Sequence, residues 1–123
     1  MEIEYSSEEV KNQCESVKAA KKLFNGDMQL VTKLMSRVEA ISAAETLKDI
    51  VIQTQFRFHK LKNIGKSRLE GYYAIDVKTR REPWRIILRP MREKGQAFDT
   101  FNVDELADKV EIVEIREVSK HYE

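Results

Sequence analysis

The stretch that decides the fold of this chain is residues 56–90, F-R-F-H-K-L-K-N-I-G-K-S-R-L-E-G-Y-Y-A-I-D-V-K-T-R-R-E-P-W-R-I-I-L-R-P. Apolar and polar residues alternate along three runs within it, at about 56–61, 72–77 and 84–89. A period of two residues is typical of β-strands with one buried face. The segments between the runs are polar and charged, so we predict three strands that follow one another in an antiparallel meander.

Alternation also divides the side chains of these runs between the two faces of the predicted sheet. In the third run, Trp84, Ile86 and Leu88 are expected to face the core, which leaves the positions between them on the open side. The groups expected to share a face are Phe56 with Phe58, Tyr73 with Ile75 and Val77, and Trp84 with Ile86 and Leu88, whereas Arg57, His59, Arg85, Ile87 and Arg89 point the other way.

The chain before this stretch predicts a short strand and a first helix. Residues 1–5 alternate as a strand with one buried face. Ser6 occupies the position of a helix N-cap, and Glu9 can complete a capping box three residues later. The apolar residues that then recur at helical spacing are Val10, Cys14, Val17, Ala20 and Phe24.

A second helix should follow after a very short turn. Asn25-Gly26 tolerates a left-handed backbone and should end the first helix, while Asp27 can cap the next one. The wide apolar stripe of this second helix is Leu30, Val31, Leu34, Met35, Val38, Ile41 and Leu47. Two helices joined so closely are expected to pack as an antiparallel hairpin, over about residues 7–48.

The C-terminal part predicts one further strand. Residues 91–108 break the alternation and are expected to form a loop, with a helical turn at about 103–106. Residues 110–118 are apolar on both faces, so this strand should be central in the sheet. We therefore predict one α+β domain over residues 1–123, in which an antiparallel sheet core at about 56–118 is backed by the N-terminal helical hairpin.

Composition and charge limit the class of protein. Hydrophobic residues are 41% of the 123, enough for the core of one domain. The net charge is only +1, but residues 56–94 hold 12 Lys or Arg against 4 acids, or +8, and the rest of the chain is −7. A basic patch on strands, interleaved with aromatic residues, is the electrostatic pattern of a protein that binds a polyanion.

The sequence also indicates where the protein works. No apolar run approaches the ~20 residues of a membrane span, and the acidic N-terminus lacks an apolar signal region, so we expect a cytoplasmic protein. Cys14 is the one cysteine, which excludes an internal disulfide and a cysteine-based zinc site. Its place on an apolar helical stripe predicts a core residue rather than a nucleophile.

Four motifs in order resemble a known family. They are H-K-L-K at 59–62, R-x-x-G-Y-Y-A-I-D-V at 68–77, W-R-I-I-L-R-P at 84–90 and V-E-I-V-E-I-R-E-V-S-K-H-Y at 110–122. Together with the helical hairpin before them, they resemble the RelE/ParE superfamily of type II toxin–antitoxin toxins, in its HigB-like plasmid maintenance killer branch. The resemblance implies a compact antiparallel sheet backed by two helices. It also implies an endoribonuclease, or mRNA interferase, that cuts mRNA in the ribosomal A site.

The same resemblance implies the partners of the protein. These are the ribosome and its mRNA, and a cognate antitoxin of the helix-turn-helix, HigA-like kind that holds the toxin inactive in an oligomeric complex. The chain departs from the family at two places. Asn63 replaces a usual glycine in a lengthened loop, and the terminal Asp-Tyr-His becomes Lys120-His121-Tyr122. The division of acid and base roles therefore stays open.

RNA cleavage through the 2′-hydroxyl needs a base, cations that stabilise the charged phosphorane-like state, and an acid for the leaving oxygen. It needs no metal or other cofactor. Histidine suits proton transfer at neutral pH, and arginine can engage two phosphate oxygens at once. With the resemblance, the candidate catalytic residues are Arg85, His121, Lys62, His59, Arg68 and Tyr122, and the candidate RNA-binding residues are Arg57, Lys60, Lys66, Tyr72, Arg89 and Lys120.

Several interpretations remain open at this point. An arginine after a tryptophan in a strand is also a common structural anchor, and charged strand faces are often only solvated. The same fold could belong to a ParE-like toxin that inhibits DNA gyrase, or to a non-catalytic module that binds RNA or the ribosome. On the enzymatic hypothesis, we expect one concave face of the sheet to be lined by Arg57, His59, Lys62, Arg68, Arg85 and the tail 120–122.

Overall fold

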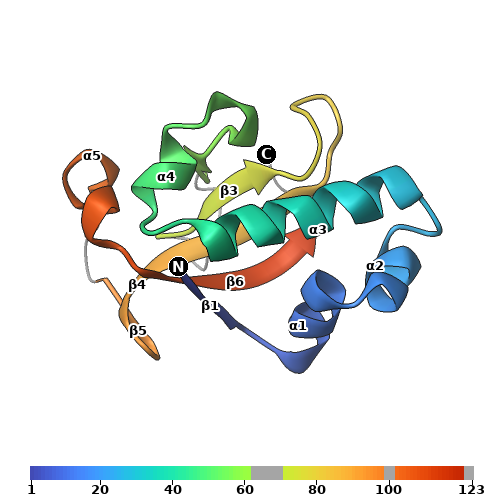
Figure 1. The fold of residues 1–123 in the computed structure, drawn as a ribbon, viewed down its shortest axis with the longest axis horizontal. Coiled ribbons are helices and arrows are strands. Elements are labelled where there is room, and N and C mark those ends of the chain that lie inside the picture. The colour runs from blue at the N-terminus through green and yellow to red at the C-terminus, as the bar shows by residue number, and fades with distance from the viewer. Residues whose placement is uncertain (62–70, 99–101, 121–123) are drawn as a thin grey trace.

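The computed structural model of the protein describes residues 1–61, 71–98 and 102–120, and its class is α+β, as predicted (Figure 1). The elements in chain order are β1 (Glu2–Tyr5), α1 (Glu8–Glu15), α2 (Val17–Leu23), α3 (Met28–Ala43), α4 (Lys48–Val51), η1 (Thr54–Phe56), β2 (His59–Lys60), β3 (Tyr73–Asp76), β4 (Arg85–Glu93), β5 (Gln96–Ala97), α5 (Val103–Leu106), η3 (Ala107–Lys109) and β6 (Ile112–Ser119). None of the helices in these ranges is long and apolar enough to cross a membrane.

The strands form one sheet in the order β1-β6-β4-β3-β2, and β5 pairs with β4 outside this path. Strands β2, β3 and β4 are the predicted antiparallel meander, and β6 lies between β1 and β4, as its two apolar faces indicate. Two features were not predicted. Strand β1 runs parallel to β6, so the sheet is mixed, and β4 continues to Glu93 into a hairpin where a loop was expected.

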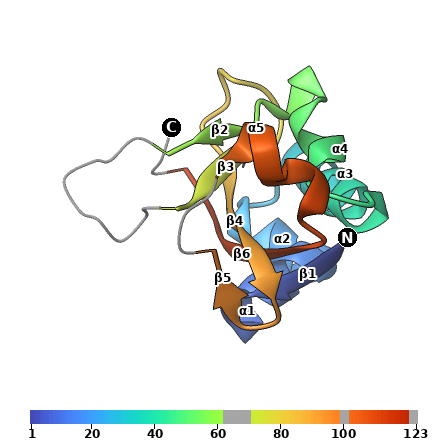
Figure 2. The same cartoon turned by 90° about the vertical axis from the view of Figure 1, so that its left-hand side faces the viewer.

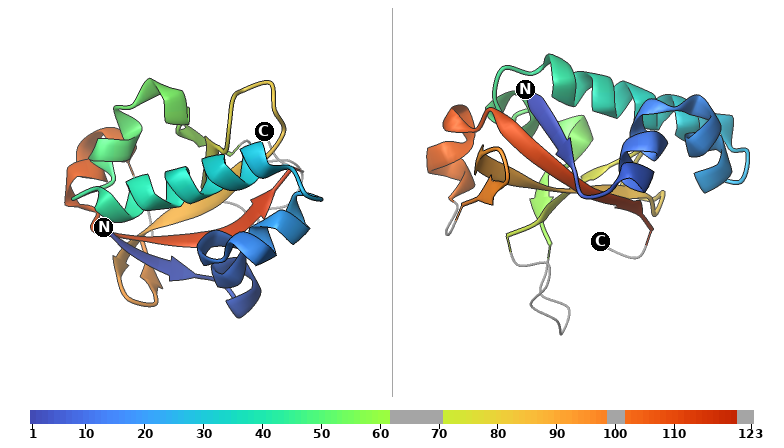
Figure 3. Two further views of the ribbon diagram at one scale, coloured as in Figure 1. Left: turned by 45° about the vertical axis from the view of Figure 1, so that its right-hand side comes forward. Right: turned by 90° about the horizontal axis from the view of Figure 1, so that it is seen from below.

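The long helix α3 lies across one face of the sheet, and α1 and α2 lie beside it over the same face (Figures 1 and 3). The core between the two layers contains the fully buried side chains of Leu34, Ile41, Ile75, Ile86 and Ile115. The predicted alternation of Trp84, Ile86 and Leu88 is confirmed, since all three pack in this cluster.

The first helical arm differs from its prediction, because it is two helices rather than one. Ser16 has an extended backbone that ends α1, and its hydroxyl accepts a hydrogen bond from the N–H of Ala19 at the start of α2. The cap of α1 was also misplaced. Ser7, not Ser6, accepts from the N–H of Val10, because the Ser6 hydroxyl donates to a carbonyl of β6 instead. Serine is favoured in such caps and disfavoured inside helices.

The turn between α2 and α3 is the predicted one. Asn25 and Gly26 both have left-handed backbones, with φ of 52° and 85°. The N–H of Gly26 donates to the carbonyl of Lys21 at 2.9 Å and that of Asn25 to Lys22 at 3.3 Å, the two bonds of a Schellman motif. Asp27 then caps α3 through two backbone N–H groups. The helix ends at residue 43, earlier than the predicted 48.

The first strand of the meander is much shorter than predicted. Instead of residues 56–61, only His59–Lys60 forms a strand, because Phe56 ends a 3₁₀ turn and Arg57 is left-handed, with φ 48° and ψ 51°. That conformation breaks the alternation on which the prediction rested. Phe58 nevertheless stacks on Tyr73, with ring centroids 4.8 Å apart, so these two aromatic rings share a face as expected.

We call the sheet face away from α3 the open face, and Figure 2 shows α3 and α4 on the other side of the sheet. This face is not wholly polar. Leu61, Tyr72, Ala74 and Ile87 form a second buried apolar cluster. The cluster separates polar side chains towards the start of β4 from others further along it, so the candidate residues fall into groups.

Candidate functional site

The first group is organised by Asp76, at the end of β3. Its side chain is 2% exposed, and Arg85 is its direct neighbour in the β3–β4 register. The Nε of Arg57 donates to both carboxylate oxygens, at 2.9 and 3.2 Å, and the Nε of Arg85 lies 3.1 Å from Oδ1 at ion-pair distance. One carboxylate thus holds two of the predicted site arginines together.

Arg85 is directed into the loop between β3 and β4. It is 5% exposed, and its Nη1 donates to the carbonyls of Thr79, Glu82 and Trp84 while Nη2 donates to that of Arg80. These contacts fix the backbone of the loop from inside. The arrangement is that of a structural anchor, the alternative to a phosphate clamp for an arginine at this place in the strand.

Arg57 is placed differently from its neighbour on Asp76. Its side chain is 31% exposed, and only its Nε is used by the carboxylate. The two terminal nitrogens of Arg57 make no hydrogen bond with any residue in the described ranges. A guanidinium fixed at Nε and open at its outer edge is suited to contact phosphate oxygens.

His59 lies two residues after Arg57, on the edge strand β2. Its Nδ1 is 2.6 Å from the backbone carbonyl oxygen of Arg57. A carbonyl only accepts, so Nδ1 must be the donor, and in the neutral ring the lone pair is then on Nε2. This contact therefore favours the tautomer of His59 with the proton on Nδ1 and the lone pair on Nε2.

A second group lies further along the open face, around Tyr72. Its ring is 5% exposed and has the guanidinium carbons of Arg89 and Arg116 at 5.0 and 5.3 Å from its centroid. Glu114 accepts from the Tyr72 hydroxyl at 3.3 Å and pairs with Arg89 at 3.1 Å. The Tyr72 ring, predicted to bind RNA, is thus packed against two cations, which form the outer layer here.

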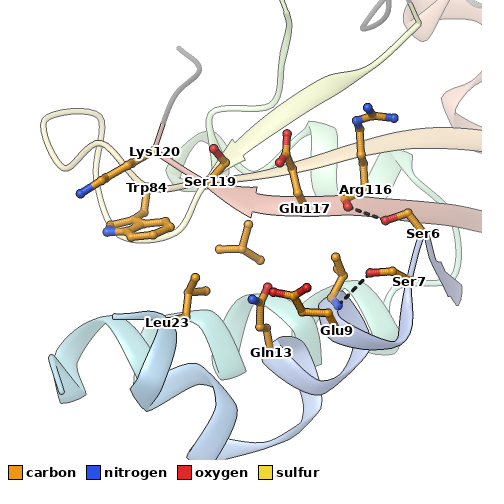
Figure 4. Close-up of a pocket in the computed structure, with 12 residues that line it drawn as sticks. Ser6, Ser7, Glu9, Gln13, Leu23, Trp84, Arg116, Glu117, Ser119 and Lys120 are labelled. Carbon is orange, nitrogen blue, oxygen red and sulfur yellow. Dashed lines mark hydrogen bonds between the residues drawn. The ribbon is translucent and has the colours of Figure 1, made fainter. Parts of the chain in front are cut away.

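Lys120, the described residue of the tail 120–122, does not lie where the single-face hypothesis put it. The Nζ of Lys120 is 5.7 Å from the centroid of the Trp84 ring, and Trp84 packs against the helices. Both residues line a cleft of about 380 Å³ between β6 and α1–α2, where Leu23 also lies (Figure 4). Lys120 is therefore on the helical side of the sheet, whereas the Arg116 side chain points away from the cleft.

Sequence reasoning missed two residues that shape this site. Asp76 was counted only as an acid, although a carboxylate inside an apolar strand is itself a signal for a buried partner. Arg37 comes from α3, and its guanidinium donates to the carbonyls of Gln55, Asp76 and Lys78 while lying 4.6 Å from the Phe56 ring. Burial lowers the pKa of Arg37. No local pattern in a long amphipathic helix indicates such a contact.

The other candidates divide by position. Lys60 is exposed and pairs with Tyr73, so alternation places it on the opposite face from His59. Five candidates lie outside the described residues and stay predictions: Lys62, Lys66, Arg68, His121 and Tyr122.

Two further results bear on the chemistry of the site. Among the described residues, no three His, Cys, Asp or Glu side chains are grouped so that they could hold a metal ion. The chain matches no model of a known protein family and no characterised protein in sequence comparisons. The function must therefore be inferred from the residues themselves.

Proposed function

We propose that this protein is the toxin of a type II toxin–antitoxin system, a ribosome-dependent endoribonuclease of the cytoplasm that cuts translated mRNA. The observation that carries the proposal is the pairing of Arg57 and His59 on the open face. No described residue uses the outer nitrogens of Arg57, and the Arg57 carbonyl accepts from Nδ1 of His59, two residues later, at 2.6 Å. A fixed cation next to a general base is what attack by a 2′-hydroxyl requires.

The proposed reaction is a transesterification within the RNA. Nε2 of His59 accepts the proton of the 2′-hydroxyl, and the 2′-oxygen attacks the adjacent phosphorus. Arg57 stabilises the charge on the non-bridging oxygens. The bond to the 5′-oxygen then breaks, and a protonated group supplies its proton, leaving a 2′,3′-cyclic phosphate and a 5′-hydroxyl. His121 and Tyr122, predicted catalytic residues whose acid or base role the sequence leaves open, are the groups that we propose for this step.

The charge distribution supports a ribosomal substrate. Residues 56–94 hold +8 while the remainder of the chain is −7. A concentrated cationic region favours a polyanion, and the low total charge favours one bound through a focused patch. The same region is suited to neutralisation by an acidic or helical segment of a helix-turn-helix antitoxin, with which we propose that the toxin forms an oligomer.

The test is induction of the protein in growing cells, with primer extension on one message in translated and untranslated forms. We expect growth arrest and cuts only in the translated message. A DNA gyrase supercoiling assay with the purified protein accompanies it. Arrest without such cuts, together with gyrase inhibition, would assign the protein to the ParE-like alternative. Ribosome binding without either activity would leave a non-catalytic module.

A matched pair of variants tests the role of His59. His59→Asn keeps an N–H near the place of Nδ1 and so retains a donor for the Arg57 carbonyl, but it has no basic nitrogen. We expect cleavage to fall by ~10²–10⁴, the usual contribution of a general base. Lys48→Gln, at an exposed position of α4, is the control that removes a charge elsewhere. Full cleavage by His59→Asn would contradict the mechanism.

A further inference from the structure

We propose that Asp76 is a positioning residue, which sets the orientation and tautomer of His59 by holding the turn at Arg57. The inference rests on the proposed function only where it concerns RNA cleavage, since the geometry can be tested without RNA. It assigns to a buried carboxylate a role in a site that it does not itself touch.

The first step is that Asp76 is immobile. Its carboxylate is 2% exposed and held from one side by Arg85, with Nε 3.1 Å from Oδ1. Its backbone carbonyl accepts from the Nε of Arg37 at 2.9 Å, which links it to α3. Strand pairing fixes the same residue opposite Arg85. The carboxylate therefore has a fixed position, and the partly exposed Arg57 side chain binds to it.

The second step concerns the backbone of Arg57. Its left-handed conformation is unfavourable for a residue with a β-carbon, so another interaction must stabilise it. The backbone of the turn has hydrogen bonds from the Phe56 N–H to the carbonyl of Gln53 and from the Arg57 N–H to that of Thr54, both at 3.1 Å. The paired contacts from the Arg57 Nε to Asp76, at 2.9 and 3.2 Å, add a charged interaction to them. Asp76 thus favours a conformation that the backbone alone disfavours.

The third step leads from this turn to the histidine ring. The left-handed turn directs the Arg57 carbonyl to Nδ1 of His59, at 2.6 Å. If Arg57 relaxes to an ordinary backbone conformation, that carbonyl turns away and Nδ1 loses its acceptor. The neutral ring is then able to place its proton on Nε2, the position that the proposed base needs unprotonated.

The direct test is ¹⁵N nuclear magnetic resonance of the full chain with labelled histidine, at about pH 8, where an ordinary histidine is neutral. The His59 signals are assigned by their loss in His59→Asn. We expect the wild type to show the Nδ1–H tautomer at His59. In Asp76→Asn the signals should move towards the mixed tautomers of free imidazole. Glu114→Gln, which breaks the ion pair of Glu114 with Arg89 on the same face, should leave them unchanged.

Asp76→Asn leaves Arg85 without its buried charge partner, which can prevent this variant from folding. A second pair of variants tests the proposal in that case. Arg57→Gly removes the guanidinium but adopts a left-handed backbone readily, whereas Arg57→Ala lacks both the ion pair and that freedom. We expect the Nδ1–H tautomer of His59 to persist in Arg57→Gly and to be lost in Arg57→Ala. The two proteins lose the same charge, so only the backbone of the turn distinguishes them.

The activity measurement separates positioning from binding. Asp76→Asn removes a negative charge, so attraction for RNA should be the same or stronger and KM should not rise. We expect kcat to fall on the order of 10²-fold, the effect of a misplaced catalytic group. An unchanged His59 spectrum in folded Asp76→Asn protein, or in Arg57→Ala protein if the former does not fold, overturns the proposal. Tautomer changes in a protein that cuts no RNA would support the positioning role and refute the proposed function.

Discussion

At the residue scale, Arg85, the first arginine of the W-R-I-I-L-R-P motif, stabilises the loop that connects β3 to its own strand, β4. Its guanidinium is enclosed by the carbonyls of the β3–β4 connection and by Asp76. Removing one partner of a buried ion pair leaves the other charge uncompensated, at a cost of ~3–5 kcal/mol. We therefore expect Arg85→Ala to reduce the free energy of unfolding by about that amount, measured by urea denaturation.

The control for this prediction is Arg89→Ala. Its ion pair with Glu114 is partly exposed, at 31% and 16% for the two side chains, so its loss should cost at most ~1 kcal/mol. If Arg85→Ala were as stable as the wild type and yet unable to cleave RNA, the residue would be a phosphate clamp after all.

Cys14 allows a second prediction at this scale. Burial, with a smaller contribution from Glu15, raises the pKa of its thiol from 9.0 to about 12. The native state thus binds a proton that the unfolded state has lost between about pH 9 and 12. Stability is therefore unaffected by this group below pH 9, and falls above it by up to ~1.4 kcal/mol per pH unit.

The measurement is urea denaturation at several alkaline pH values. Burial also raises the pKa of Tyr5, which adds a loss of stability in the same direction above pH 10. Cys14→Ala should remove the contribution of the one thiol proton to the slope of the free energy of unfolding against pH. The contribution of Tyr5 should remain. An equal slope in both proteins would contradict the assignment.

At the scale of elements, the sequence predicted those structures that local chemistry determines. Asn25, Gly26 and Asp27 end one helix and begin the next as their conformational preferences indicate. The failure at the first strand of the meander occurred where a contact distant in sequence accompanies an unexpected backbone conformation. The left-handed Arg57 contacts Asp76, 19 residues later, through its side chain, and no alternation pattern contains that information. The start of α1 and the break before α2 were mispredicted because Ser6, Ser7 and Ser16 are all residues that can cap a helix.

The helix start at Ser7 gives a prediction for this scale. Its hydroxyl accepts from the N–H of Val10 at 3.2 Å. Ser7→Ala should therefore lower the free energy of unfolding by ~0.5–2 kcal/mol, the usual value of an N-cap. Ser36→Ala is the matched control, since Ser36 is exposed within α3, where alanine is the better helix former. A neutral Ser7→Ala would mean that α1 begins elsewhere.

For the whole molecule, the sequence predicted a basic sheet but not its internal grouping. Arg57 and Arg85 were expected on one face, and they do meet, through Asp76. What charge counting could not supply is the buried carboxylate between them, or the transfer of Lys120 to the side of Trp84. Both depend on the register in which β3, β4 and β6 pair. The composition of the sequence does not determine that register.

The loop that Arg85 holds presents two exposed cations, Arg80 and Arg81. Because its backbone is fixed from inside, we expect these side chains to contribute to polyanion binding as a preformed pair. Changing both to glutamine should reduce the log–log salt slope for binding of single-stranded RNA by about 1.4, or ~0.7 per charge. Equilibrium titration at several salt concentrations measures it. The same change at the exposed Lys48 and Lys109 should leave the slope unaltered, and equal slopes for both pairs would exclude a specific surface.

The place of β6 has a consequence for synthesis of the protein. Residues 112–119 come late in the chain, yet they form the strand between β1 and β4. Strand β1 is made well before its partner β6, so it cannot join the sheet until β6 has left the ribosome. Such distant pairing forms late in folding. On the proposed function, the growing chain is thus harmless to the ribosome that makes it until β6 has emerged and the sheet can close around that strand.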